Sequence, residues 1–220
     1  VKYKGVGSAN NNPAQPELLK KAGQRITREI LSLDHVQNGM RETGTINLLD
    51  HMNIHNCLPV HNFQYGSHQE ATLIYNQIWK NRISQNQVGD SCWIGCNLRC
   101  SHAVDQFKLK TGPLRGKSVI VDGPEYETAA GLGSNGGMFD PEYVIEANFY
   151  CDTYGICTIT WGTTLAFILE CYQRGVLNKE RTGGLDLTWG NTSDALELLH
   201  QLARGEGFGK IAGLGVHKLK

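Results

Sequence analysis

The chain of 220 residues carries 21 basic and 21 acidic side chains, so its formal net charge is zero. A neutral chain without a lysine and arginine cluster gives no electrostatic footprint for nucleic acid, and no apolar run approaches the ~20 residues of a membrane span. Its seven cysteines are an odd number, which argues against a complete disulfide framework. We therefore expect a cytoplasmic protein whose cysteines bind a metal.

Helical periodicity runs through most of the chain. It predicts helices over residues 17–33, 45–56, 69–84, 158–175 and 195–204. Asp140 followed by Pro141 is a typical helix start, and it predicts a further helix that stops at Gly155. Only 118–121 has clear strand character, and the glycine-rich stretch 125–137 is expected to be a loop that can approach a ligand closely. The predicted fold class is mainly α with little strand content.

Three thiols fall within nine residues, at Cys92, Cys96 and Cys100. Gly95 and Asn97 lie between them and disfavour a helix. A loop that presents several thiolates suits one soft centre, either an iron–sulfur cluster or zinc. The alternative is a stripe of inert or redox-active thiols, because residues four apart share one helix face and buried cysteine packs as a small apolar group.

Three histidines lie near the turn at Leu58 and Pro59. His51, His55 and His61 flank this turn, and Glu42 precedes it. Because histidine changes charge near neutral pH, at least one of these side chains is a candidate for proton transfer. The alternative is a structural role, which is the commoner one for a single histidine.

Five motifs occur along the chain in a fixed order. They are the cysteine loop 92–100, 123–128 (GPEYET), 132–135 (LGSN), 152–157 (DTYGIC) and 187–191 (LTWGN). Together they make the chain resemble the aldehyde ferredoxin oxidoreductase family, which are tungsten enzymes with a bis-pterin cofactor. The likeness extends from about Thr43 to Lys220 and is closest to the helical middle domain of that family. Residues 1–220 are expected to form one cluster- and pterin-binding domain within a longer polypeptide.

The resemblance implies a tungsten or molybdenum bis-pterin and a 4Fe-4S cluster, with magnesium as a further candidate ion. The cluster ligands that it implies are Cys92, Cys96 and Cys100. The pterin-binding residues that it implies are Asp152, Gly155, Ile156 and Cys157. A carboxylate accepts charge-assisted hydrogen bonds from pterin N–H groups, and a glycine lets the backbone approach the flat ring.

The resemblance also implies a proton carrier. Glu127 corresponds to a family glutamate near the metal, and Glu42 and His51 are the further catalytic candidates. A solvated loop carboxylate is the alternative for Glu127. A helix-end hydrogen bond is the alternative for Asp152.

The chain departs from the family pattern at two cysteines. Three residues separate Cys92 from Cys96, where the family usually has two, and Cys157 stands where the family's first motif copy usually has aspartate. Three roles are possible for Cys157: a contact to the pterin, a metal ligand, or an unreactive thiol in the core. The remaining thiols are expected in the core, at Cys57, Cys151 and Cys171.

The function implied is part of the catalytic subunit of an iron–sulfur, bis-pterin oxidoreductase. Its substrate would be an aldehyde, or an acyl-CoA if the chain is the tungsten subunit of an ATP-independent benzoyl-CoA reductase, a hypothesis favoured by the cysteine spacing and the histidine-rich turn. Its partner would be ferredoxin or an iron–sulfur subunit, in a homo- or hetero-oligomer. A hypothesis from another class is a non-enzymatic, zinc-binding interaction module.

Overall fold

The computed structural model describes residues 14–34, 36–75 and 96–219. Cys92 lies outside the described residues, as does most of the helix predicted over 69–84, of which residues 71–75 are helical. Cys96 and Cys100 lie inside the described residues.

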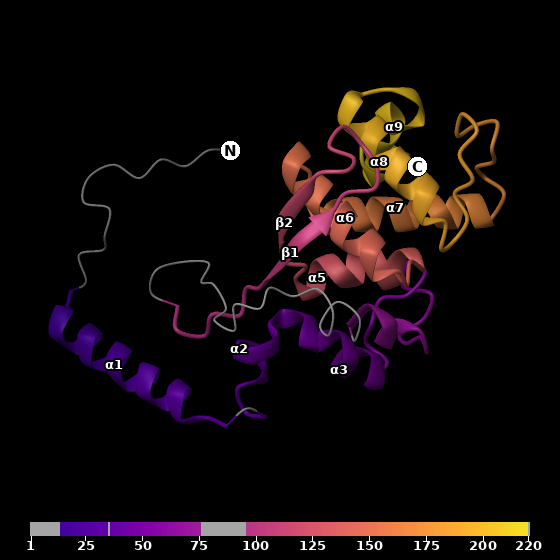
Figure 1. Cartoon of the computed structure of the whole chain (residues 1–220). Helices are drawn as coiled ribbons and strands as arrows, with labels where there is room; N and C mark the ends of the chain where they lie inside the picture. The colour runs from indigo at the N-terminus through magenta and orange to yellow at the C-terminus, as the bar shows by residue number, and fades with distance from the viewer. Residues whose placement is uncertain (1–13, 35, 76–95, 220) are drawn as a thin grey trace.

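Helices make up most of the described chain, which confirms the mainly α prediction (Figure 1). The first group is α1 (Pro16–Ser32), α2 (Gly39–Thr43), the 3₁₀ turn η1 (Thr45–Asn47) and α3 (Leu48–Ile54). The hairpin β1 (Ala103–Lys108) and β2 (Ser118–Asp122) follows. The last group is α5 (Tyr126–Thr128), η2 (Ala129–Gly133), η3 (Ser134–Gly136), α6 (Pro141–Tyr154), α7 (Thr158–Gln173), α8 (Thr192–Arg204), α9 (Gly207–Ala212) and α10 (Val216–Leu219).

The predicted helix ends around α6 are present as expected. The Asp140 side chain accepts a hydrogen bond from the backbone N–H of Glu142 at 2.9 Å, and Pro141 occupies the first turn. Gly155 ends the helix with φ 70°, a left-handed conformation that glycine adopts without steric cost. Residues next to α6 in the sequence therefore determine where this helix begins and ends.

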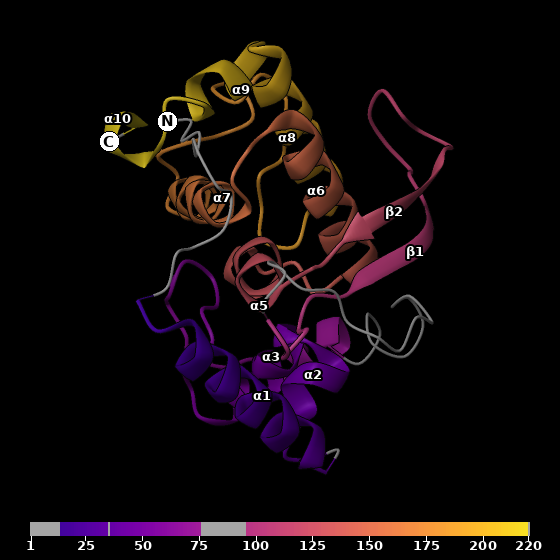
Figure 2. The ribbon, with the colours of Figure 1, turned by 90° about the vertical axis from the view of Figure 1, so that its left-hand side faces the viewer.

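The core lies where α6 and α7 pack over the turn η2 and α8 packs on α6; Figure 2 shows the three helices together. Side chains of α6 and α7 are buried around most of each helix, including Tyr150, Ile145, Leu165 and Ile168. Cys151 is buried among them, as predicted. Burial on this scale stabilises by roughly 1.5–3 kcal/mol for each large apolar side chain.

Strand β1 was not predicted; it pairs antiparallel with β2. Its alternating pattern is broken between Val104 and Phe107, where the register shifts. Gln106 lies in this irregular stretch with φ 53°. A bulge of this kind hides a strand from period-two analysis, because the residues after it face the opposite way.

The stretch 125–137 is helical rather than a loop, which corrects the prediction. It forms α5, a π-helical turn η2 and a 3₁₀ turn η3, and most of it is buried. Its glycines serve close packing here. A Cβ on Gly162 of α7 would lie 2.6 Å from the carbonyl carbon of Gly131 in η2, so these two elements meet backbone to backbone.

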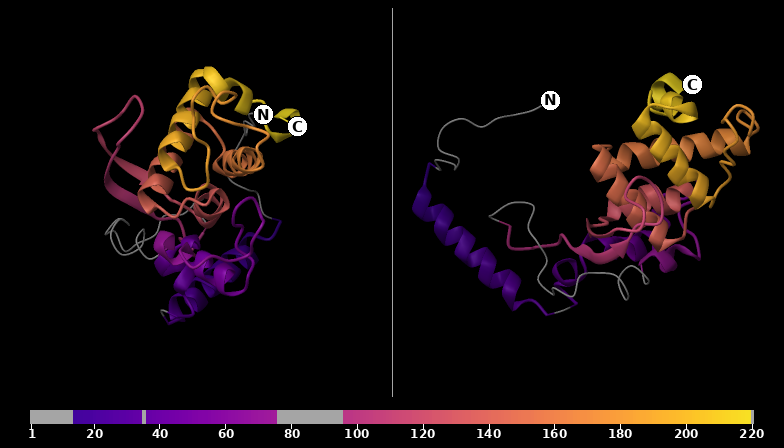
Figure 3. Two further views of the ribbon diagram at one scale, coloured as in Figure 1. Left: turned by 90° about the vertical axis from the view of Figure 1, so that its right-hand side faces the viewer. Right: turned by 45° about the horizontal axis from the view of Figure 1, so that its top comes forward.

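Helix α1 is present as predicted but buries none of its side chains. Figure 1 and the right panel of Figure 3 show it beside the packed body rather than within it. Within the described ranges, no helix is long and apolar enough to cross a membrane.

The glycine contact yields a stability prediction. We expect Gly162→Ala to lower the free energy of unfolding by about 1–3 kcal/mol, since the added methyl meets backbone that cannot move aside. This loss occurs although alanine is the better helix former by about 1 kcal/mol. Differential scanning calorimetry measures the change.

Gly23→Ala in α1 is the matched control for this substitution. A Cβ there has no neighbour within 4 Å among the described atoms, so the variant should be as stable as the parent or slightly more so. Equal midpoints for Gly162→Ala and the parent would contradict the predicted close contact.

Candidate active site

A cleft of about 440 Å³ lies between the cysteine loop and the turns that lead into α5 and α7. Its lining includes Cys96, Cys100, Asp122, Glu125, Asn148 and Asp152. Two predicted cluster ligands and the predicted pterin aspartate therefore share one cavity, although they are more than fifty residues apart in sequence. Soft thiolates and hard carboxylates are ligands for different groups, so one cleft can hold a cluster beside a polar organic cofactor.

The cysteine loop is held by α1 and α2. The Asn97 side chain donates to the Thr27 hydroxyl of α1 at 2.7 Å. The Asn97 carbonyl oxygen lies 3.5 Å from the Arg41 guanidinium of α2. The His102 ring nitrogen Nε2 lies 3.3 Å from the Arg41 carbonyl oxygen. These contacts fix the loop on both sides of Cys100.

Gly44 lets α2 approach this loop. It has φ 73°, and a Cβ there would lie 2.9 Å from the Cys100 carbonyl oxygen and from the His102 ring. A larger residue would push the loop away from α2, so the glycine sets the position of Cys100.

A polar network forms the wall of the cleft opposite the loop. The Asn148 amide donates to the Asp122 carbonyl oxygen at 2.6 Å and lies 3.5 Å from the Asp152 carboxylate. The Ser101 hydroxyl donates to the Asp122 carboxylate at 3.4 Å. Burial in the cleft wall raises the pKa of Asp152, and the Asp122 carboxylate raises it further. Asp152 thus lines the cleft from the last turn of α6.

Thr45 fixes the entry to α5. Its hydroxyl donates to the Glu125 carboxylate and accepts the backbone N–H of Tyr126 at 2.9 Å. One side chain from η1 therefore orients Glu125, which lines the cleft, and starts the helix that carries Glu127.

The motif at 152–157 spans the junction between α6 and α7. Ile156 packs against the core, whereas Gly155 and Cys157 are exposed. The Thr160 side chain and the backbone N–H groups of Thr160 and Ile159 favour the thiolate and lower the pKa of Cys157. The core-thiol alternative for Cys157 is therefore wrong.

Three predicted catalytic residues lie outside the lining of the cleft. Glu127 is exposed on α5, Glu42 is exposed on α2, and His51 is exposed on α3. None of the three is among the residues that line the cleft, and their catalytic roles stay predictions.

Two other predicted residues have clear structural positions. Cys57 is exposed, so its assignment to the core was wrong. His61 stacks on Trp189 at 4.7 Å between ring centroids. Among the described residues, which do not include Cys92, no group of three or more histidine, cysteine or acidic side chains could hold a metal ion. Magnesium therefore stays a prediction without a site in this part of the chain.

The sequence analysis did not identify Asn148, Asp122 or Thr45 as parts of the site. A signal existed for Asn148, because it precedes Asp152 by four residues and so shares its face of α6. Asp122 and Thr45 come from distant segments, and only the tertiary structure brings them to the cleft.

A second cleft of about 480 Å³ opens on the opposite side of α6, and it too was missed. His200 lies beneath it with 2% of its surface exposed. The Thr111 hydroxyl donates to buried Glu146 at 2.7 Å and so accepts from His200 Nε2 at 2.9 Å. The Tyr154 hydroxyl then donates to His200 Nδ1 at 2.9 Å. This chain of bonds fixes a neutral histidine with its proton on Nε2.

A mainly helical body that carries thiols and a carboxylate in one cleft is the architecture expected of a cofactor-binding redox domain. Residues 21–220 match the family described as aldehyde ferredoxin oxidoreductase, domains 2 and 3. The chain belongs to the aldehyde ferredoxin oxidoreductase family.

Relatives with curated names agree with this assignment. The tungsten-containing aldehyde ferredoxin oxidoreductase of Pyrococcus horikoshii is 33% identical over 184 residues, which cover 82% of this chain and 28% of the relative. The corresponding protein of Thermococcus kodakarensis is 34% identical over 167 residues, covering 74% and 24%. The aliphatic sulfonate oxidoreductase, WOR-like subunit, of Pyrococcus furiosus is 33% identical over 164 residues, covering 73% and 24%. The chain thus spans about a quarter of the length of these relatives.

The buried histidine yields a pH prediction. Burial lowers the pKa of His200 in the folded state; Glu197 and Glu146 oppose this shift, and Arg204 adds to it. Between the lowered pKa and the ordinary value of about 6.5, the unfolded chain binds more protons than the folded chain. The free energy of unfolding therefore falls as the pH drops below about 6.5, by at most ~1.4 kcal/mol per pH unit for this one group.

His200→Gln should reduce the dependence of the unfolding midpoint on pH between 7 and 5, as measured by calorimetry. His217→Gln, at an exposed position on α10, is the matched control and should leave the slope unchanged. The slope is compared rather than the midpoint itself, because loss of the buried hydrogen bonds lowers stability at every pH. An identical slope for His200→Gln and the parent would contradict the assignment of a neutral, buried histidine.

Proposed function

We propose that the chain is a segment of the catalytic subunit of a tungsten bis-pterin, iron–sulfur oxidoreductase that acts on aldehydes. The observation that carries the proposal is the shared cleft, where Cys96 and Cys100 face the same cavity as Asp152. Family membership supports an oxidoreductase over a zinc-binding interaction module, and the names of the relatives favour tungsten over molybdenum.

The donor set fits the two groups. A 4Fe-4S cluster takes thiolate ligands, and Cys96 and Cys100 supply two, with Cys92 proposed as the third. A pterin presents amino and ring N–H groups, and Asp152 and Asp122 supply acceptors for them. Gly155, with its exposed left-handed backbone, offers no side chain that would block a flat ring.

When bound, these groups would supply two-electron oxidation of an aldehyde and water to a carboxylic acid, two protons and two electrons, and one-electron transfer to an external ferredoxin or iron–sulfur subunit. The residues of this chain would position them. The ionised carboxylate of Asp152 would bind the pterin, and the Asn148 amide would orient this carboxylate. Cys157, whose lowered pKa favours the thiolate, would contact the pterin at the start of α7.

Protons released in the reaction need acceptors near the cleft. We assign Glu127 this role, with Glu42 and His51 as further acceptors along the exposed surfaces of α2 and α3. A homo- or hetero-oligomer would complete the enzyme.

A second candidate substrate is an aromatic acyl-CoA. The observation that favours it is the three-residue gap between Cys92 and Cys96, which departs from the usual family spacing. Reduction of benzoyl-CoA, but not oxidation of an aldehyde, by the full-length enzyme would select this alternative.

The cluster assignment yields a metal-content prediction. Full-length protein purified without oxygen should be brown and contain roughly four iron atoms per chain. Cys96→Ala should lose most of this iron, because a thiolate ligand is removed from the cleft. Cys57→Ala removes an exposed thiol outside the cleft and should keep the iron. Iron-free, zinc-loaded parent protein would instead support the interaction module.

The pterin assignment yields a second content prediction. Asp152→Asn replaces a charged acceptor by an amide of similar shape, and loss of a hydrogen bond to a charged group costs about 1.5–3 kcal/mol. We expect the variant to retain the pterin and tungsten roughly 10- to 100-fold less tightly. Asp105→Asn, on an exposed position of β1, is the matched control. Full tungsten and pterin content in Asp152→Asn after dialysis would argue against the role of Asp152.

A further inference from the structure

One side of α1 carries positive charge that has no ion-pair partner within the described ranges. Lys20, Lys21 and Arg28 of α1 are all exposed, beside the exposed Glu17 one turn earlier, and we call these three basic residues the basic face. Arg25 on the same helix is different, because it pairs with Glu29 at 3.3 Å. Unpaired charges on one face create a long-range potential that attracts a surface of opposite sign.

The basic face lies against the cysteine loop. A cleft of about 510 Å³ between α1 and the loop is lined by Lys20, Gln24, Thr27 and Arg28 of the helix and by Asn97 of the loop. The hydrogen bond from Asn97 to Thr27 ties the two segments together. Asn97 directly follows Cys96, so the charges lie close to the proposed cluster.

Helix α1 also offers apolar surface next to these charges. Leu18, Leu19 and Ile26 are 61%, 57% and 48% exposed. A small docking surface with apolar contacts beside a charged rim is typical of transient protein complexes. The charges would govern the rate and orientation of docking, and the apolar side chains would add contact area.

We infer that the basic face is the docking surface for the electron carrier, and that this carrier is a small acidic redox protein. The inference rests on the proposed function, since only a cluster in the cysteine loop gives a carrier a reason to bind there. The carrier would take one electron at a time from the reduced cluster, with the basic face holding its acidic surface over Asn97. Neither Lys20 nor Arg28 is placed in the cleft that contains Asp152.

The test uses the full-length enzyme purified without oxygen, with Lys20→Glu and Arg28→Glu combined. Aldehyde oxidation is measured with two acceptors, a purified acidic ferredoxin and the small cationic dye methyl viologen. We expect the KM for ferredoxin to rise at least about tenfold and its dependence on salt to weaken, because the long-range attraction is reversed. The kcat with methyl viologen should stay unchanged, because the dye needs no protein docking surface.

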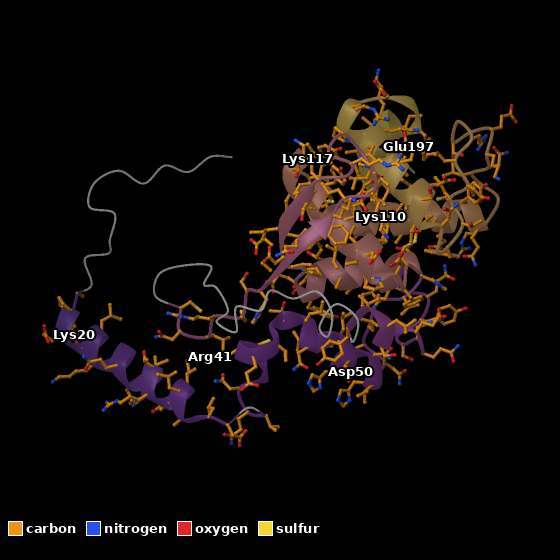
Figure 4. All side chains as sticks on the ribbon, in the orientation of Figure 1. Lys20, Arg41, Asp50, Lys110, Lys117 and Glu197 are labelled. Atoms are coloured by element: carbon orange, nitrogen blue, oxygen red, sulfur yellow. The ribbon has the colours of Figure 1, made fainter. Side chains whose placement is uncertain are left out.

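Lys117→Glu is the control charge reversal; it changes the net charge by two, against four for the double variant. Lys117 is the last residue of the loop that joins β1 to β2; it is exposed and lies well away from Lys20 in Figure 4. Its KM for ferredoxin should equal that of the parent. An equal rise in KM for Lys117→Glu would overturn the inference, since net charge rather than the basic face would then explain the effect.

The inference and the proposed function fail in different ways. An unmodified enzyme without tungsten, iron or viologen-linked activity would contradict the proposed function. Normal viologen activity with an unchanged KM for ferredoxin in the α1 variant would overturn the inference alone, and would indicate that another part of the polypeptide covers the basic face. A loss of viologen activity equal to the loss with ferredoxin would also overturn it, because the charges would then matter to the site and not to docking.

Discussion

The constraint on which the structure depends is the burial of polar groups on α6. Glu146 and Asn148 are 1% and 3% exposed, so each must find hydrogen-bond partners inside the protein. Glu146 accepts the backbone N–H groups of Lys110 and Thr111, which follow β1, and Asn148 donates to the carbonyl oxygen of Asp122 at the end of β2. The hairpin is therefore fastened to α6 at two places. An unsatisfied buried partner at either place would cost about 1–3 kcal/mol.

These hydrogen bonds between the hairpin and α6 also position the described part of the cysteine loop. The loop leads directly into β1, and the backbone N–H of Gly123 donates to the carbonyl oxygen of His102 at 2.8 Å. One end of the loop is thus fixed through the hairpin to α6, while α1 and α2 hold the residues around Asn97 and Cys100. Cys96 and Cys100 line the same cleft as Asp152, and these contacts hold the described part of the loop on both sides of Cys100. The same attachment places α1 next to the loop, where its charges can act on a docking partner.

Local signals in the sequence predicted much of the fold. The periodic apolar residues of α1, α7 and α8, and the Asp140-Pro141 start of α6, depend only on neighbours in the chain, and each of these helices is present. Stretch 125–137 was misjudged because its glycines suggest flexibility, whereas Gly131 lies against Gly162 and is needed for close helix packing. Strand β1 was missed because its register shift interrupts the alternation. The cleft residues with recognisable motifs were found, but Asp122, Asn148 and Thr45 owe their roles to contacts across long sequence separations.

Cys151 and Cys157 lie six residues apart around the junction of α6 and α7. Cys151 is buried, whereas Cys157 is exposed. Burial raises the pKa of Cys151 to about 12, so this thiol stays protonated and inert. Cys157 is exposed at the start of α7, where nearby donors favour its thiolate. Oxygen and peroxide attack thiolates, so in the absence of a covering cofactor Cys157 is oxidised to the sulfenic acid well before Cys151. Of these two thiols, Cys157 is therefore the first that air oxidises, and a reducing thiol reverses the damage only while the oxidation has not passed the sulfenic stage.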